Sequence, residues 1–308
     1  MSVIKRKSSI ALVAGVIVVL LFIPVWYAML VPSVVASELE KIEIITSYEG
    51  TFGKAGYIGT YTVINKSGVW EIPICIIAHV CAIEVKGDNV VLRFDVNIVR
   101  NDTGETLPPP FSTNSTYVFD KFTLENVKDC PDANKPREGY DPLYPSHLEA
   151  GEDIPDVWLD TLNETATLRF EGSVVEEDVT LYKYFVNKTI NKTLWIEDLK
   201  LFRNCTLTST KTVLIEPLSG ILAYAENETF DWVYTYGSTR IPLVHFTYES
   251  TAEAKADGIA TAKEAHDGLQ LLELYIPIFL GVVAIMLTTA LAFNVRRLKR
   301  KGAPKSKT

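Results

Sequence analysis

The sequence predicts a membrane-anchored, mainly β protein of the α+β class, in which an antiparallel-sheet extracytoplasmic domain lies between N- and C-terminal transmembrane helices. Three observations predict this architecture. A long uncharged apolar run lies near each end of the 308 residues. Between the runs, segments rich in β-branched and aromatic residues alternate with short polar turns. An alanine-rich segment before the second run has a helical period, which predicts a stalk.

The first apolar run, residues 10–31, predicts a transmembrane helix after a cytoplasmic N-terminus, residues 1–9. About 20 apolar residues cross a bilayer core of about 30 Å. Lys5, Arg6 and Lys7 precede the run, and an excess of Lys and Arg marks the cytoplasmic side. A cleaved secretory signal is the alternative, but the apolar region of such a signal has only about 7–15 residues. We therefore favour an uncleaved anchor.

The second apolar run, residues 274–295, predicts another transmembrane helix. A basic tail, residues 296–308, follows it directly, and Glu273 precedes it. The same charge rule makes this tail cytoplasmic and makes residues 32–273 extracytoplasmic. A buried helix of a soluble core is the alternative, but core helices seldom run this long without a polar face.

The extracytoplasmic segment is strongly acidic. Of the net charge of −8, the two cytoplasmic ends contribute +3 and +7, so the rest of the chain carries −18. Such a charge argues against nucleic acid or anionic lipid headgroups as partners. It favours a solvated outer surface.

Eight of the chain's 13 asparagines open a sequon of the form N-x-Ser/Thr, and all eight lie in the same segment. Such sequons are acceptors for N-glycosylation outside the cytoplasm. We predict a glycosylated exterior, which on a two-anchor envelope protein points to an archaeon or a eukaryote. Chance occurrence in threonine-rich strands is the alternative. The candidate acceptors are Asn65, Asn101, Asn114, Asn163, Asn187, Asn191, Asn204 and Asn227.

The four cysteines, Cys75, Cys81, Cys130 and Cys205, also lie in this segment, where an oxidising environment favours disulfides. Cys75 and Cys81 would be about 20 Å apart on one extended strand, far beyond the roughly 7 Å limit for a bridge. They can pair with each other only if the chain turns at residues 77–80, which lack turn-forming residues. We lean slightly towards each joining Cys130 or Cys205, which gives two disulfides and no free thiol.

The extracytoplasmic segment reads as two groups of strands joined by a long connection. The proline-rich residues 128–155 form this connection, either as a subdomain boundary or as a covering loop. Gly87-Asp88-Asn89 predicts a hairpin turn in the first group. The second group predicts an antiparallel meander. The expected strands are 41–64, 69–99 and 116–124 in the first group, and 165–172, 179–186, 193–201, 207–216, 220–225, 231–236 and 242–248 in the second.

Residues 251–272 predict the helical stalk, which follows a capping-box pattern at residues 250–253 and contains Gly258 and Gly268 as its strongest breakers. Several strands before it carry large apolar side chains on both faces. Both faces of the sheet therefore need a cover, which the stalk, the proline-rich connection, glycan, a partner or a bound lipid could supply.

A family resemblance rests on four stretches: residues 181–187 (LYKYFVN), residues 212–222 (TVLIEPLSGIL), the alanine-rich helix and the apolar run LYIPIFLGVVAIML after it. Together with the paired terminal anchors, they resemble the PorA family of two-pass envelope proteins of unknown function from actinobacteria and archaea. The resemblance implies this architecture. It supplies no catalytic residues.

We predict no catalytic, cofactor-binding or metal-binding residue. The four histidines are scattered without a metal-binding pattern, and no nucleotide-binding or hydrolase motif is present. Carboxylates at residues 149–160 have ligands suited to Ca²⁺, but a solvated acidic loop explains them better.

We therefore expect a structural or interaction module without catalysis, with the lipid bilayer and an envelope protein as partners and no nucleic acid. The alternative is a carrier or receptor for lipid or another apolar ligand at the outer membrane face. A hydrolase-type ectoenzyme is a third and weaker possibility.

Overall fold

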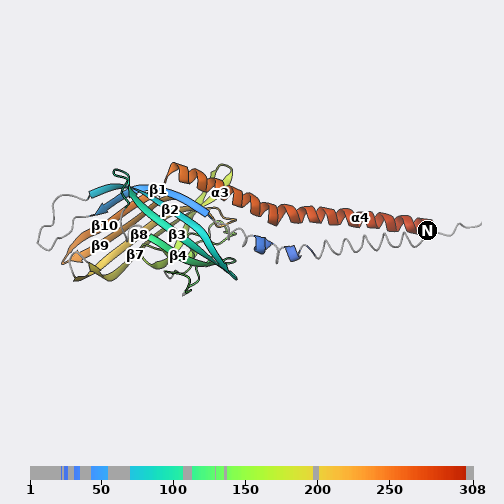
Figure 1. Cartoon of the computed structure of the whole chain (residues 1–308). Helices are drawn as coiled ribbons and strands as arrows, with labels where there is room; N and C mark the ends of the chain where they lie inside the picture. Colours follow the sequence, from blue (N-terminus) through green and yellow to red (C-terminus); the bar gives the residue numbers. More distant parts are fainter. Residues whose placement is uncertain are drawn as a thin grey trace, which may run out of the picture. The chain divides into compact units, whose positions relative to one another are not determined.

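The computed structural model describes residues 22, 24–26, 31–34, 43–54, 70–106, 113–128, 130–134, 137–196 and 201–302. The chain divides into two compact units, Glu38–His266 and a second unit formed by Met1–Ser37 with Asp267–Thr308. The strands lie in the first unit and the apolar helix lies in the second (Figure 1).

Ten antiparallel strands form one sheet with the order β4-β3-β2-β1-β10-β9-β8-β7-β6-β5. The chain thus makes two meanders, and the pairing of β1 with β10 joins them. The strands are β1 (Glu43–Lys54), β2 (Trp70–Lys86), β3 (Asn89–Arg100), β4 (Thr113–Asp120), β5 (Ile154–Leu159), β6 (Glu164–Glu176), β7 (Val179–Ile196), β8 (Leu201–Ile215), β9 (Leu222–Tyr236) and β10 (Thr239–Ser250). The mainly antiparallel β fold is therefore confirmed.

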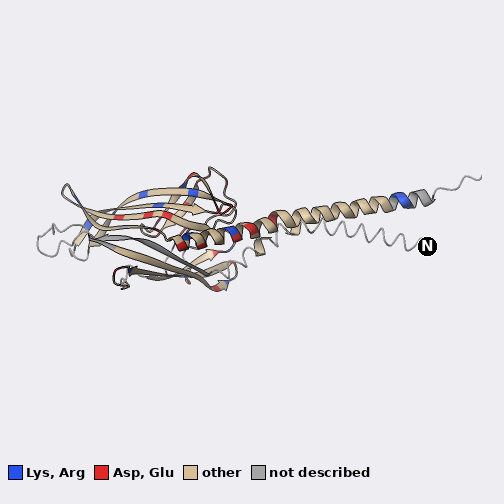
Figure 2. Cartoon of the chain, turned by 90° about the horizontal axis from the view of Figure 1, so that it is seen from above, with Lys and Arg blue, Asp and Glu red and all other residues tan. Residues whose placement is uncertain are grey.

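Backbone pairing continues beyond the two edge strands, because the connection between β4 and β5 bridges them. Phe119 of β4 pairs with Asn126, and Asn126 pairs with Gly139. The next residue, Tyr140, pairs with Val157 of β5. The sheet thus closes on itself through this connection, which protects backbone groups that an open edge would expose. In Figure 2 the strands accordingly form two layers.

Several strands are longer than the sequence predicts. Residues 179–186 and the start of 193–201 belong to one strand, β7, and residues 231–236 and most of 220–225 belong to one strand, β9. The polar stretches between them stay extended because they pair with β8, fully in β7 and with one register shift at Glu226 in β9. The predicted hairpin turn at Gly87 and Asp88 is present, and Gly87 supplies the positive φ of 64° that such a turn needs.

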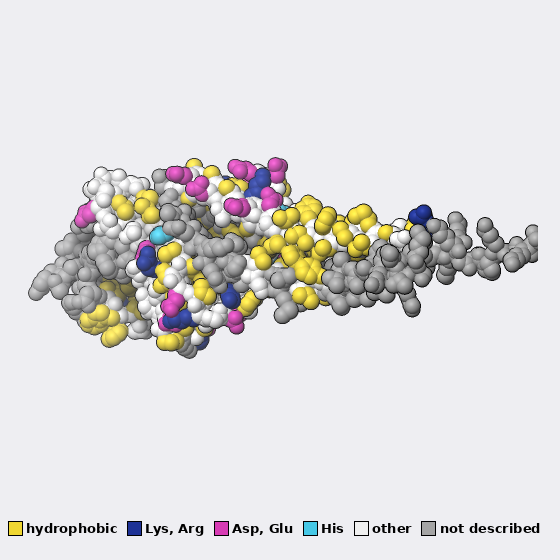
Figure 3. Space-filling model, turned by 45° about the vertical axis from the view of Figure 1, so that its right-hand side comes forward, with side chains coloured by type: hydrophobic (Ala, Val, Ile, Leu, Met, Phe, Trp, Pro, Cys, Tyr) yellow, Lys and Arg dark blue, Asp and Glu magenta, His cyan; other side chains and the backbone are white. Residues whose placement is uncertain are grey.

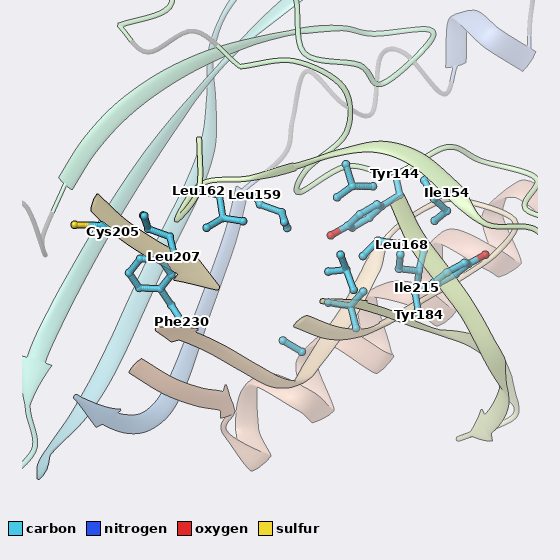
Figure 4. Packing of buried hydrophobic residues seen from close by; sticks show 14 of the residues in the cluster. Tyr144, Ile154, Leu159, Leu162, Leu168, Tyr184, Cys205, Leu207, Ile215 and Phe230 are labelled. Atoms are coloured by element: carbon cyan, nitrogen blue, oxygen red, sulfur yellow. The ribbon is translucent and has the colours of Figure 1, made fainter. Parts of the chain in front are cut away.

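The inner face of the sheet, defined here as the face towards residues 137–162, holds the main hydrophobic core. Tyr144, Ile154, Val157 and other side chains of the proline-rich connection and β5 pack there against β6 to β9. The labelled side chains point towards one another in Figure 4. The connection thus acts as a covering loop within one compact unit.

Helix α3 (Ala252–Gln270) covers part of the opposite, outer face. Its buried Ile259 and Ala262 pack against Leu181, Leu214 and Tyr224 of β7, β8 and β9. At Gly258 the helix comes so close that a Cβ atom would lie 1.8 Å from the carbonyl oxygen of Ala223. The chain's own helix therefore covers this part of the second apolar face.

The cap of α3 differs from the expected pattern. Thr251 is the capping residue, because its Oγ1 accepts the Ala254 N–H at 3.1 Å. The Ser250 hydroxyl oxygen instead accepts the N–H of Ala225 on β9 at 3.0 Å. Ser250 thus ties the helix start to the sheet. The helix runs through both Gly258 and Gly268.

In the second unit, a π-helical turn η3 (Leu271–Tyr275) leads into helix α4 (Ile276–Gly302). The helical stretch Ala252–Asn294 has the length and apolar composition to cross a membrane. Hydrophobic side chains gather along α4 in Figure 3, and Ile285, Phe279 and Phe293 are at least 65% exposed. These features fit the second predicted transmembrane segment. Most of the first predicted segment, residues 10–31, lies outside the described residues.

Candidate functional site

The outer face of the β7–β8 hairpin carries a row of cross-strand pairs beyond the part that α3 covers. The four pairs are Thr189–Thr208, Asn191–Thr206, Thr193–Asn204 and Trp195–Phe202, and we call these eight residues the outer ladder. They share one face because successive side chains of a strand point to opposite sides. The alternate residues, such as Cys205 and Leu207, enter the core.

In three of the four pairs of the outer ladder, a hydrogen bond joins the two side chains. The hydroxyls of Thr189 and Thr208 lie 3.0 Å apart. The next two pairs both join the sequon Asn191–Thr193 of β7 to the sequon Asn204–Thr206 of β8. Thr206 donates to the amide oxygen of Asn191 at 2.8 Å, and Thr193 donates to the amide oxygen of Asn204 at 2.9 Å. Each sequon thus supplies the hydroxyl that orients the other's asparagine.

The last rung is aromatic. The rings of Trp195 and Phe202 meet edge to face with centroids 5.2 Å apart, a favourable geometry for two aromatic rings. Trp195 is 44% exposed and Phe202 is 65% exposed. A pair of large exposed aromatic rings at the end of a polar row is a surface suited to contact with another molecule.

A hollow of about 500 Å³ lies beside the polar rungs. The hollow is lined by Lys192 and Cys205, whose side chains point to the inner face, and by the amide and hydroxyl side chains of Asn191, Thr193, Asn204, Thr206 and Thr235 of β9. These amide and hydroxyl groups are neutral and both donate and accept hydrogen bonds. The hollow therefore suits a neutral, hydroxyl-rich group better than an apolar chain.

The other predicted acceptor asparagines also lie at the surface. Asn101, Asn114, Asn163, Asn187 and Asn227 are exposed, as are the two asparagines of the outer ladder. Asn65 lies outside the described residues. Their exposure leaves room for a saccharide at each described position, and glycosylation itself stays a prediction.

On the inner face, beyond the end of the outer ladder, lies a group of charges in which Lys211, Asp141 and Arg137 are largely buried and Asp160 is exposed. Lys211 of β8 lies 3.0 Å from a carboxylate oxygen of Asp141. Arg137 contacts Asp141 at 3.6 Å and also pairs with Asp160, whose other oxygen accepts the Trp158 indole N–H at 2.9 Å. The Lys211–Asp141 pair joins the sheet to the covering loop. Because the pair is buried, the loss of either side chain would leave the other charge uncompensated.

Glu228 lies in the same inner row, directly opposite Lys211 on β8 and Tyr248 on β10. Burial raises the pKa of Glu228 above its usual value, and the carboxylates of Asp141 and Asp160 add to this shift. Lys211 and a hydrogen bond with Tyr248 lower it, without cancelling the rise. Burial alone would lower the pKa of Lys211, but the Asp141 and Glu228 carboxylates hold it well above the usual range.

A buried carboxylate also fixes the turn between β8 and β9. Glu216 is fully buried and accepts the backbone N–H groups of Leu218 and Ser219 and the Ser219 hydroxyl at 2.6 to 3.1 Å. Nδ1 of His266 on α3 lies 2.7 Å from the same carboxylate. The Glu-Pro-Leu-Ser-Gly stretch thus forms a turn and connects the sheet to α3.

The acidic residues at 149–160 serve local structure. Asp153 accepts the backbone N–H of Phe170 at 2.8 Å, and Glu152 accepts that of Glu149 at 3.4 Å. No group of three or more His, Cys, Asp or Glu side chains suited to a metal ion occurs among the described residues.

The two expected disulfides are not formed, because all four cysteines are free. Cys75 and Cys81 lie on the uninterrupted strand β2, so the chain does not turn between them. Cys205 is 1% exposed on the inner face of β8, and β1, β10 and β9 separate that strand from β2. The structure thus contains none of the bridges expected between Cys75 or Cys81 and Cys130 or Cys205.

Sequence reasoning singled out the asparagines of the outer ladder but missed the pairing between them. The available signal was the repeated spacing Phe-x-Asn-x-Thr, at Phe185 with Asn187 and again at Phe202 with Asn204. The partner of each rung depends on the β7–β8 register, which the sequence of one strand does not determine.

No curated protein matches the chain. The family model described as Porin PorA matches residues 8–293, which confirms the resemblance carried by the two apolar runs and by residues 181–187 and 212–222. The chain therefore belongs to the PorA family.

Proposed function

We propose that this membrane-associated protein presents a glycosylated extracytoplasmic β-rich domain, residues 32–273, as a structural or interaction module without catalysis. Two terminal helices would hold the domain at the envelope, with both termini in the cytoplasm. The observation that carries this proposal is the filling of the inner face of the sheet by the chain's own covering loop.

The distribution of polarity supports a domain that stands in water. The inner face holds an apolar core that includes Tyr184, Leu207 and Ile215, whereas the outer ladder is formed mainly by threonine and asparagine. A membrane-spanning β-barrel has the reverse arrangement, with apolar side chains towards lipid and polar side chains inside. This sheet is therefore poorly suited to form the pore that the family description names.

The same core argues against the carrier alternative. A carrier of lipid needs an apolar cavity of about several hundred Å³. Here Tyr144, Leu159 and Leu162 of the covering loop and its continuation pack against the positions that would line such a cavity. Half of the lining of the hollow beside the outer ladder is polar, so an acyl chain would bury less apolar area there than in an apolar pocket.

Epitope tags on the whole chain test the proposed topology. One tag is inserted at the exposed turn between Gly237 and Ser238, and a second, in a separate variant, follows Thr308. The proposal predicts antibody binding to the first tag on intact cells, and to the second only after the membrane is permeabilised. Binding to the C-terminal tag on intact cells would contradict it, as would inaccessibility of the turn.

A further inference from the structure

We propose that a saccharide attached to Asn204 packs against Phe202 and occupies the hollow beside the outer ladder, so that this glycan stabilises the β7–β8 hairpin. The proposal rests on the glycosylated exterior proposed above. It goes further by assigning one glycan a binding site on the protein itself.

The spacing along β8 places an aromatic ring, an acceptor asparagine and a sequon threonine in one row on the same face of the strand. Residues i and i+2 of a strand share a face and lie about 6.5 to 7 Å apart. Phe202, Asn204 and Thr206 therefore present an aromatic ring, the acceptor amide and the sequon hydroxyl in order on the outer face. A single sugar ring attached to the amide is long enough to reach the phenyl ring.

The rung to β7 orients the acceptor. Thr193 holds the amide oxygen of Asn204 at 2.9 Å, which leaves the amide nitrogen available. That nitrogen carries the saccharide in an N-linked glycan. Because Asn204 itself lines the hollow, the first sugar emerges beside it.

The chemistry of a sugar ring matches both parts of this surface. One face of a pyranose presents C–H groups, which pack on an aromatic ring and remove apolar area from water. Its hydroxyl edge suits Asn191, Thr193 and Thr235, which donate and accept hydrogen bonds at the hollow. Without such a cover Phe202 stays 65% exposed.

The other described sequons provide comparisons. Asn163 lies in the turn between β5 and β6, with Thr161 two residues before it in place of an aromatic residue. A saccharide there has no ring to cover. Asn163→Gln therefore serves as a control, since it removes an exposed acceptor from the same domain. The cost of a glutamine at its positive φ of 55° is the same in both hosts and cancels in the difference between them.

The test compares the whole chain from a host that N-glycosylates with the same chain from a bacterial host that does not. Glycopeptide mass spectrometry measures occupancy of Asn204. Thermal unfolding is then measured for the wild type, Asn204→Gln, Phe202→Thr, the double variant and the control Asn163→Gln from both hosts. The bacterial set reports what each substitution costs without glycan, which is the Thr193 hydrogen bond in Asn204→Gln and the ring contact with Trp195 in Phe202→Thr.

We expect glycosylation to raise the Tm of the wild type by about 2–4 °C, the shift that 1 kcal/mol produces in a domain of this size. We expect most of that gain to vanish in Phe202→Thr, and little change from Asn163→Gln. If Asn204 is unoccupied while other sequons carry glycan, the inference is overturned and the proposed function stands. If no sequon is occupied, both fail. If Asn204 is occupied but the gain persists without the phenyl ring, only the packing is refuted.

Discussion

Lys211 and Asp141 form an ion pair inside the closed sheet, with Nζ and Oδ1 3.0 Å apart and side chains 11% and 13% exposed. The pair joins β8 to the covering loop across 70 residues of sequence. We predict that Lys211→Met lowers the free energy of unfolding by about 3 kcal/mol, because it leaves a buried carboxylate with Arg137 as its remaining cationic partner.

Urea denaturation measures this effect, with Lys183→Met as the matched control. Lys183 pairs with Glu226 on the outer face, where the two side chains are 30% and 49% exposed. Because water screens that pair, the control should lose less than about 1 kcal/mol. An equal loss of unfolding free energy in the two variants would show that the Lys211–Asp141 pair contributes no more to stability than a surface pair.

The raised pKa of Glu228 makes stability depend on pH. The folded chain binds this proton more tightly than the unfolded chain, whose carboxyl titrates near 4.5. Between that pH and the raised pKa the folded state holds more protons, so the free energy of unfolding falls as pH rises. Glu228→Gln cannot ionise, and its amide oxygen can still accept from Tyr248.

We therefore expect Glu228→Gln to gain stability relative to the wild type as pH rises from about 4.5, and to reach a plateau above the raised pKa. Urea midpoints over a pH series measure the difference. A difference that is constant with pH would mean that burial does not shift this carboxyl.

Two glycines of α3 test how the helix packs on the sheet. A Cβ at Gly258 would lie 1.8 Å from the Ala223 carbonyl oxygen, whereas nothing lies within 4 Å of the corresponding position at Gly268. Alanine favours a helix over glycine by roughly 1 kcal/mol. Gly268→Ala should therefore be neutral or slightly stabilising, while Gly258→Ala should cost about 1–3 kcal/mol because the helix must move. Chemical denaturation that ranks the two variants in the opposite order would refute this packing.

The positions of the cysteines predict their reactivity. Cys205 is 1% exposed, so a water-soluble maleimide should modify it only after unfolding. Mass spectrometry of an unreduced digest should recover Cys205 as a free thiol and should contain no Cys75–Cys81 bridge. A bridge between these two would require β2 to turn at residues 77–80, where it is continuously paired with β1 and β3.

The sequence predicts the β-rich domain and the second helix well because both depend on local pattern. Residues 274–295 are apolar throughout, and helix α4 covers nearly all of them. The strand ends were less predictable. Asn187 and Lys192 disfavour a strand by composition, yet they lie within β7 because β8 pairs with that whole segment.

The functional surface depends on contacts that are distant in sequence. Asn191 and Asn204 are visible as acceptors in the sequence, but their mutual threonine partners follow only from the hairpin register. The inner ion pairs depend on the closure of the sheet by the covering loop, and no local pattern around Lys211 indicates Asp141 as its partner. The free state of Cys205 likewise depends on which face of β8 enters the core.

Because the chain's own loop fills the inner face, we expect lipid to contact the membrane helices alone. Photocrosslinking tests it most directly, with the whole chain reconstituted in vesicles that contain a photoactivatable fatty acid and phospholipid. We predict labelled peptides from the apolar runs, among them residues 274–295, and none from the inner-face segments around Tyr184 and Leu207. Stoichiometric labelling of those inner-face segments would contradict the account and establish a lipid carrier.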